Sequence, residues 1–157
     1  NAIPFADARF DAAVMHTLLH HSQKPASILQ EIARTLKSYG VLLLAELIGS
    51  DDAVKRATYN AIEERRSPAH AQVRTADQLR KLITTAGFTI EAEKVVILDR
   101  DFDEWLNEYL VDETRREVVR KMVEAGFEAN AAGLNVRRQG ERLVIEQKLL
   151  YTKARKK

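Results

Sequence analysis

The sequence predicts an α/β fold in a single domain of 157 residues. Two short apolar runs of the kind found in buried strands flank a helix with one apolar face, all between residues 10 and 45. This order of strand, helix and strand is typical of a parallel βαβ unit with a right-handed crossover. Further helices follow, and an antiparallel pair of strands is predicted at the end of the chain.

The first strand is predicted at residues 10–15 (FDAAVM). The helix that follows should begin at Pro25, because a missing N–H costs nothing at the first helical position. Its apolar face repeats at helical spacing, at Ile28, Leu29, Ile32 and Leu36. Gly40 is expected to end this helix or form the turn after it. Residues 41–45 (VLLLA) then read as a strand buried on both faces.

The middle of the chain carries two helix-start signals. Residues 49–52 (GSDD) are expected to cap a helix that continues to about Arg65, and Pro68 breaks it because the residue before proline avoids the helical region. Residues 75–78 (TADQ) have the capping-box pattern, in which a side-chain oxygen is followed three residues later by Gln. The helix that they start is expected to end at Gly87.

The last third of the chain is predicted to contain a strand, two helices and a closing antiparallel pair. The strand is expected at residues 89–98, and the helices at residues 102–110 and 114–125, the second ended by Gly126. The closing strands are expected at residues 134–136 and 143–153, joined by a turn at Gln139 and Gly140.

Composition excludes several classes of protein. Hydrophobic residues make up 45% and charged residues 31%, as in an ordinary globular protein. A net charge of +2 argues against a nucleic-acid partner, and the basic run at residues 153–157 reads as a solvated tail. The longest apolar run, residues 41–45, is far below the roughly 18–20 residues of a membrane span, so no membrane partner is expected. The absence of cysteine fits a cytoplasmic location.

Four segments resemble a known family when they are taken together. Residues 3–11 (IPFADARFD) resemble a stretch that leads into the fourth strand of class I S-adenosylmethionine-dependent methyltransferases, and Leu19-His-His21 with Pro25 resembles the segment just after that strand. Residues 31–44 are similar to the family's next helix and strand, and Ala86-Gly-Phe88 is similar to its AGF turn. The order and spacing resemble the ubiquinone/menaquinone biosynthesis branch, as do residues 63–74 and the closing residues 140–154.

The resemblance implies a partial Rossmann-like methyltransferase fold. Residues 1–98 would be the Rossmann-like portion, residues 99–132 a helical lid-like insertion and residues 133–157 the closing strands. The family's glycine-rich cofactor loop and its acidic anchors would precede Asn1, so the chain is expected to be a truncated, C-terminal part of the domain that binds S-adenosylmethionine poorly. At one position the chain departs from the pattern: Lys37-Ser-Tyr-Gly40 stands where the family has Lys-Pro-Gly-Gly.

The resemblance also places candidate cofactor and catalytic residues after the first strand, where sites form in open α/β sheets. Met15 and His16 would contact the methionine portion of S-adenosylmethionine. Three of the four histidines lie within residues 16–21, and His20 and His21 are candidates for a catalytic general base near neutral pH. The alternative is that this pair caps the turn between strand and helix. No metal is expected, because no carboxylate or cysteine spacing accompanies the histidines.

Four residues are candidates for binding the substrate. Glu46 directly follows a buried strand, and it is either a site group or a neighbour of the next helix cap. Arg66, His70 and Arg74 flank the loop broken by Pro68, which either folds over the substrate or stays solvated. The apolar residues Phe102, Trp105, Tyr109 and Met122 either line a lid pocket or form core.

The function expected from these observations is methyl transfer from S-adenosylmethionine to a small-molecule acceptor in the parent protein. The alternative is a non-catalytic interaction module. In that case the open edge of the first strand would pair with a second copy of the chain, giving a homo-oligomer, or with a separate N-terminal half.

Overall fold

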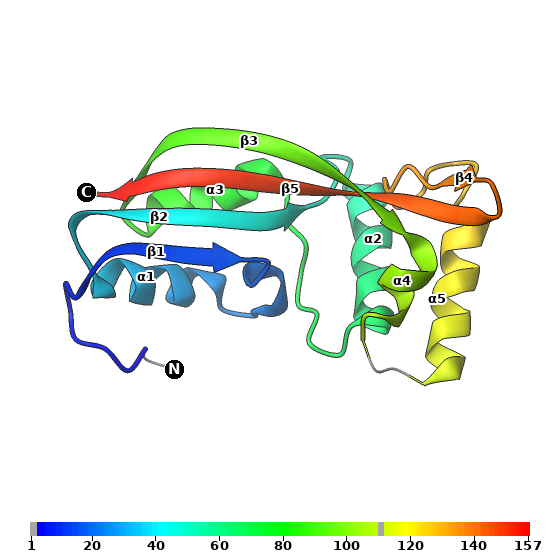
Figure 1. Ribbon diagram of the computed structural model, residues 1–157, viewed down its shortest axis with the longest axis horizontal. Coiled ribbons are helices and arrows are strands. Elements are labelled where there is room, and N and C mark those ends of the chain that lie inside the picture. The colour runs from blue at the N-terminus through cyan, green and yellow to red at the C-terminus, as the bar shows by residue number, and fades with distance from the viewer. Residues whose placement is uncertain (1–2, 110–111) are drawn as a thin grey trace.

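The computed structural model describes residues 3–109 and 112–157 of the chain. A long twisted sheet runs the length of the molecule (Figure 1). In chain order the elements are β1 (Phe10–His16), the short 3-10 helix η1 (Leu19–His21), α1 (Pro25–Thr35), β2 (Leu36–Ile48), α2 (Ala53–Arg66), α3 (Ala76–Thr85), β3 (Phe88–Asp101), α4 (Phe102–Asn107), α5 (Glu113–Ala125), β4 (Arg137–Gln139) and β5 (Arg142–Lys156).

The sheet is mixed, in the order β1-β2-β5-β3, with β4 paired to β5. β1 and β2 are parallel neighbours, with Val14 opposite Leu43 and His16 opposite Ala45, and α1 is the crossover between them. The C-terminal strand β5 pairs antiparallel with β2, β3 and β4, so it lies inside the sheet rather than at its edge. The predicted α/β class and the parallel pairing of the first two strands are confirmed.

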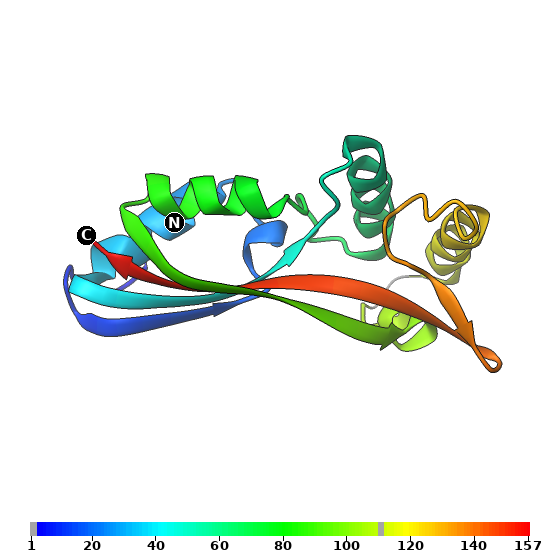
Figure 2. The same ribbon diagram turned by 90° about the horizontal axis from the view of Figure 1, so that it is seen from above.

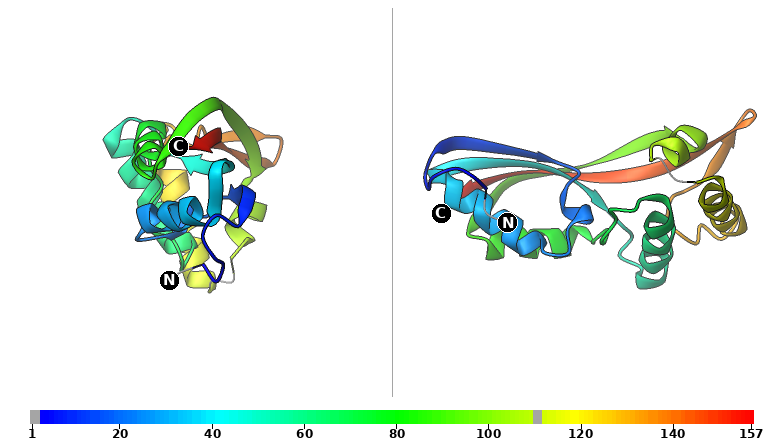
Figure 3. Two further views of the ribbon diagram at one scale, coloured as in Figure 1. Left: turned by 90° about the vertical axis from the view of Figure 1, so that its left-hand side faces the viewer. Right: turned by 90° about the horizontal axis from the view of Figure 1, so that it is seen from below.

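Two buried clusters hold the helices on the sheet. α1 and α3 lie side by side on one face and cover a core of β1, β2 and β5 side chains (Figure 2). α2, α4 and α5 surround a second cluster at the other end of the sheet, which contains the fully buried Phe102 and Trp105. Figure 3 shows α4 on the opposite side of the sheet from α2. Burial of these apolar faces supplies most of the driving force for folding.

The other face of β1 and β2 is bare. No helix lies beneath this half of the sheet in Figure 2. Val14 is 78% exposed, Leu43 43% and Tyr151 41%, and these three side chains lie on the uncovered face. β1 is also an edge strand, because it pairs only with β2 among the described strands.

The helix-start predictions are confirmed. Pro25 occupies the first turn of α1. The Asp52 carboxylate caps α2 by accepting hydrogen bonds from the backbone N–H groups of Val54 and Lys55, at 2.8 and 3.2 Å. Thr75 and Gln78 form the predicted capping box of α3, with both reciprocal bonds present. Each cap satisfies N–H groups that a helix leaves unpaired at its first turn.

The prediction for Gly40 is wrong. α1 ends at Thr35 because Leu36 takes an extended conformation, with φ −77° and ψ 141°, and Gly40 lies inside β2. The positive φ falls on Tyr39 instead, at 61°. A Cβ atom on Gly40 would lie 2.9 Å from the Lys37 carbonyl oxygen, so the close approach of backbone explains this glycine. The β1–β2 register shifts in the same region, between Phe10 and Ala12.

Other boundaries also differ from the predictions. Residues 134–136 are not a strand, because Asn135 has a φ of 43° and pairing with β5 starts at Arg137. β3 begins and ends beyond residues 89–98, because it pairs with β5 along its full length. The helix predicted at residues 102–110 ends at Asn107, and residue 110 lies outside the described residues.

The division into a Rossmann-like portion, a helical insertion and closing strands, with boundaries at residues 98/99 and 132/133, stays a prediction. The strand β3 runs across the first of these boundaries. No helix within residues 3–109 and 112–157 is long and apolar enough to cross a membrane.

The backbone at Tyr39 generates a stability prediction. An L-residue in the left-handed region costs about 1–2 kcal/mol, and glycine avoids this cost at an entropic penalty of roughly 0.5–1 kcal/mol. The Tyr39 side chain is 71% exposed and its carbonyl oxygen keeps its bond from Arg155, so little packing is lost. Tyr39→Gly is therefore expected to raise the free energy of unfolding by up to about 1 kcal/mol in urea titrations followed by circular dichroism.

The matched control is Ser38→Gly. Ser38 has no positive φ, so glycine at this position relieves no strain. It only increases the conformational entropy that the chain loses on folding, and the variant should be less stable than the wild type. Equal effects of the two variants would contradict the argument from backbone strain.

Candidate functional site

The carboxyl ends of β1 and β2 place the candidate residues at one end of the parallel pair. Thr17 directly follows β1, and its N–H donates to the Ala45 carbonyl oxygen at 2.8 Å. Its φ of 46° is an outlier for a β-branched residue, and its hydroxyl lies 3.0 Å from His16 Nδ1. Strained backbone of this kind concentrates at functional sites, so Thr17 joins the candidates although the sequence analysis did not single it out.

Glu46 and His20 form a buried pair behind this strand end. His20 Nδ1 lies 2.5 Å from Glu46 Oε1, and the two residues are 5% and 1% exposed. Glu46 Oε2 also accepts the N–H groups of Leu18 and Leu19, at 3.0 and 2.6 Å, and Oε1 accepts the N–H of Leu47 at 3.0 Å. Bonds from backbone N–H groups favour the ionised form of a carboxyl group.

This arrangement fixes the tautomer of His20. An ionised carboxylate only accepts hydrogen bonds, so Nδ1 of His20 carries the proton that it donates to Glu46. The other nitrogen, Nε2, then has a free lone pair when the ring is neutral. Within the described part of the chain, Nε2 has no hydrogen-bond partner. A buried imidazole held in this way is suited to accept a proton from a neighbouring ligand.

A cavity of about 150 Å³ lies beside His20. Leu47, Leu98 and Leu149 give it apolar walls on the bare side of the sheet. The other lining residues are polar or charged and come from β1, η1, α2, β3, β5 and the segments after β1 and α4: His16, Thr17, His20, His21, Arg66, Arg100, Glu108, Tyr109 and Gln147.

His21 is held next to His20. The two ring centroids are 4.0 Å apart. Its Nδ1–H donates to the Ala69 carbonyl oxygen at 3.3 Å, and the Tyr109 hydroxyl donates to Nε2 at 3.4 Å. Burial, followed by the charge of His20, lowers the pKa of His21. With both nitrogens engaged, His21 is less available for proton transfer than His20.

Arg66 is engaged mainly with its own protein. It is 3% exposed, and Nε and Nη2 donate to Glu63 Oε2 at 3.1 and 2.8 Å. Nη1 donates to the Trp105 carbonyl oxygen at 3.0 Å and to Glu108 at 3.2 Å. The guanidinium carbon also lies 4.2 Å from the Trp105 ring centroid and 4.7 Å from that of Tyr109. Arg66 thus joins α2 to α4 at the cavity wall.

The remaining predicted residues lie away from this cavity or behind it. Met15 is 5% exposed and its side chain belongs to the core beneath α1 and α3, so only its backbone reaches the strand end. Glu46 bonds to His20 but does not itself line the cavity. His70 faces a different hollow along α2, and Arg74 lines a groove between α1 and α3. The structure therefore brings together His16, His20, His21 and Arg66.

Gln147 and Arg100 are site residues that the sequence analysis missed. Gln147 is 4% exposed, its Nε2 donates to the Tyr59 hydroxyl at 2.9 Å, and its Oε1 accepts from Arg100 at 3.3 Å. Burial raises the pKa of the Tyr59 hydroxyl well above its usual range, so Tyr59 stays protonated. The signal available in the sequence was an amide inside the apolar strand VIEQKLL.

Metal binding finds no support in the described residues. Residues 3–109 and 112–157 contain no group of three or more His, Cys, Asp or Glu side chains placed to hold a metal ion.

Comparison with known proteins defines the class. Residues 1–93 match the sequence profile of the methyltransferase domain family. That match covers more than half of the chain. The chain therefore belongs to the methyltransferase domain family.

Two curated relatives are similar at low identity. The uncharacterized protein YafE of Escherichia coli (strain K12) is 24% identical over 105 residues, which are 67% of this chain and 51% of that protein. The uncharacterized methyltransferase YcgJ of Bacillus subtilis (strain 168) is 23% identical over 105 residues, or 67% of this chain and 42% of that protein. The chain thus spans about half the length of the curated relatives that it matches.

Solved structures confirm the fold. A candidate methyltransferase from Bacillus halodurans C-125 superposes with a TM-score of 0.87 at 23% identity, covering 98% of this chain and 72% of that one. YcgJ of Bacillus subtilis superposes with a TM-score of 0.88 at 18% identity, covering 99% of this chain and 68% of that one. The partial Rossmann-like methyltransferase fold is therefore confirmed.

His70 generates a prediction about acid stability. Its Nε2–H donates to Asn60 Oδ1 at 2.9 Å, while Nδ1 is buried without a partner in the described residues. Burial, followed by the charges of His20, His21, Arg66 and Arg74, lowers the pKa of His70 to about 4. The unfolded chain takes up this proton near pH 6.5 and the folded chain does not, so stability is lost as the pH falls from 6.5 towards 4.

His70→Gln should flatten this dependence in urea titrations across that pH range. The control is His16→Gln, which removes an exposed histidine and should keep the wild-type slope. A His70→Gln slope equal to that of the wild type would contradict the prediction.

Proposed function

We propose that this chain is the acceptor-side part of an S-adenosylmethionine-dependent methyltransferase that acts on a small molecule, with His20 as its general base. The observation that carries the proposal is the buried His20–Glu46 pair, at 2.5 Å, beside a cavity at the carboxyl ends of β1 and β2. Family membership supports the reaction class, and the position at the strand ends supports the site.

The proposed roles follow from the hydrogen bonds. S-adenosylmethionine supplies a methyl group on a sulfonium when it is bound. His20 Nε2 accepts a proton from the nucleophilic atom of the acceptor. Glu46 holds the ring in orientation and stabilises the imidazolium that forms, while three backbone N–H groups hold the Glu46 carboxylate in place. Leu47, Leu98 and Leu149 exclude water from one side of the acceptor.

The described residues fit the cofactor only in part. We assign to the cofactor side the strand end at His16 and Thr17, where Thr17 has strained backbone directly after the edge strand β1. Two carboxylates adjoin the cavity, and both are already bonded: Glu46 to His20 and backbone, Glu108 to Arg66 and Arg100. Anchoring of the cofactor's hydroxyl groups therefore falls to other residues, which agrees with the expectation of poor affinity in this chain alone.

The test is His20→Gln in the full-length protein that contains this chain, assayed with methyl-labelled S-adenosylmethionine and small molecules from the source cells. Loss of a general base is expected to lower kcat about 10²–10⁴-fold. Cofactor affinity, measured by isothermal titration, should stay close to that of the wild type.

His21→Gln is the matched control and should lower kcat less, because both ring nitrogens of His21 are engaged. Glu46→Gln should also lower kcat, because the imidazolium that forms on His20 loses its charged partner. A His20→Gln protein with wild-type kcat would refute the assignment of His20.

A second candidate function rests on the uncovered sheet. We propose as the alternative that the chain associates with a second copy or with a separate N-terminal half. Val14, Leu43 and Tyr151 on the bare face line a hollow of about 440 Å³, and the outer edge of β1 pairs with no other strand among the described residues. Such an edge beside an exposed apolar face favours strand pairing and burial by a partner.

Sedimentation of the isolated chain tests this alternative. Self-association through the face predicts a dimer at micromolar concentration, and Val14→Lys should weaken it, because a charge would then enter the apolar contact. Val54→Lys is the control, since Val54 is 75% exposed on α2 and lies outside that hollow. A monomer at high concentration, or equal dimerisation of both variants, would count against the copy-to-copy contact.

A further inference from the structure

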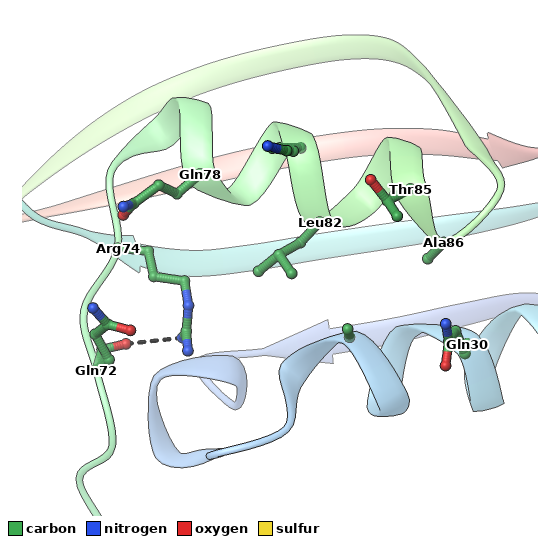
Figure 4. A pocket seen from close by; sticks show the side chains of 9 residues that line it. Gln30, Gln72, Arg74, Gln78, Leu82, Thr85 and Ala86 are labelled. Carbon is green, nitrogen blue, oxygen red and sulfur yellow. Dashed lines mark hydrogen bonds between the residues drawn. The ribbon is translucent and has the colours of Figure 1, made fainter.

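A groove between α1 and α3 forms a hollow separate from the His20 cavity. Its volume is about 350 Å³, and it shares no lining residue with that cavity (Figure 4). Ala26 and Gln30 of α1 face Leu82 and Ala86, at and just after the end of α3, and Arg74 lies where the two helices begin. The groove is on the helix-covered side of the sheet, whereas the His20 cavity has walls on the bare side.

Arg74 is the more buried of the two charged residues that line this groove. Its Nη1 donates to the carbonyl oxygens of Leu19 and Gln72, at 3.2 and 3.0 Å. Within residues 3–109 and 112–157, Nε and Nη2 have no hydrogen-bond partner, and no carboxylate lies within ion-pair distance. Burial lowers the pKa of Arg74, because the guanidinium is partly removed from water. The two bonds to carbonyl oxygens hold the guanidinium group in place. Its other edge, formed by Nε and Nη2, has no partner in the described residues.

Arg80, on α3, shows the contrast. It pairs with Asp77 at 2.5 Å and with Glu93 at 2.8 Å, and it lies outside the groove. Partly buried arginines are usually paired in this way, because desolvation of an unpaired charge is costly. The free edge of Arg74 is therefore a binding group without a ligand in the described chain.

Apart from Lys81, the rest of the groove is apolar or neutral. Residues 78, 81, 82 and 85 lie at i, i+3, i+4 and i+7 of α3 and so share the face towards α1. Leu82 points into the space between the helices, and Arg74 extends at its end (Figure 4). The glutamines at positions 30, 72 and 78 offer neutral amides, and Lys81 adds an exposed cation with no ion pair in the described residues.

We propose that this groove binds a small organic acid, with one carboxylate on the free edge of Arg74 and a compact apolar body over Leu82 and Ala86. A guanidinium edge matches the two oxygens of a carboxylate. The other cation of the groove, Lys81, is exposed to water, so the one partly buried charge of Arg74 matches a single carboxylate better than a doubly charged phosphate. The hollow, at about 350 Å³, is within the size range of small-ligand sites. This site does not depend on the function proposed for His20.

The test is a two-dimensional ¹H–¹⁵N NMR titration of the labelled chain with 3-phenylpropanoate. Shifts should be confined to the facing residues of α1 and α3 and to the Arg74 side chain. The neutral analogue 3-phenylpropanamide should bind at least about tenfold more weakly, because it lacks the charge that Arg74 recognises. Inorganic phosphate should cause no saturable shift.

Arg74→Gln should weaken binding of the acid by about tenfold or more, whereas Arg80→Gln should bind like the wild type. The same spectra report whether each variant is folded, and Arg74→Lys, which keeps the charge but not the fork, should also bind more weakly if Arg74→Gln does not fold. Equal affinity for acid and amide, saturable phosphate binding, or wild-type affinity in a folded Arg74 variant would overturn the proposal.

Discussion

The Glu46 carboxylate is the interaction on which the geometry of the site depends. A buried charge is tolerated only when hydrogen bonds replace its hydration, and Glu46 has four of them. Three come from backbone N–H groups and one from His20. The carboxylate therefore fixes the chain after β1 and the histidine ring with the same few bonds. In the proposed site, Glu46 thus holds both the segment after β1 on the cofactor side and His20 on the acceptor side.

The sheet imposes the second constraint. β5 pairs with β2 on one edge and β3 on the other, so the last strand of the chain lies between strands that precede it. The helices that cover the β1–β2 half lie on one face only (Figure 2). An α/β sheet with a parallel pair is normally covered on both faces, which is why the uncovered apolar face supports an association as the alternative function.

A buried polar network joins the sheet to the helices at its far end. Gln147 on β5 bonds to Tyr59 on α2, and Arg66 on α2 bonds to the segment of Trp105 and Glu108. These bonds link the elements although Glu63 Oε1 and Trp105 Nε1 are buried without a partner in the described residues. The predicted substrate role of Arg66 was drawn from a loop, whereas the side chain lies at the end of α2, 3% exposed, as a link between helices at the cavity wall.

The sequence by itself determined the class of fold, the parallel pair and the helix starts at Pro25, Asp52 and Thr75. These features depend on residues a few positions apart, whose preferences are legible without the rest of the chain. Tertiary structure alone decided that Glu46 meets His20 from 26 positions away, that Gln147 reaches Tyr59 across 88, and that Arg74 faces a groove apart from the histidines. Sheet register and helix packing set those contacts, and neither can be read from local preference.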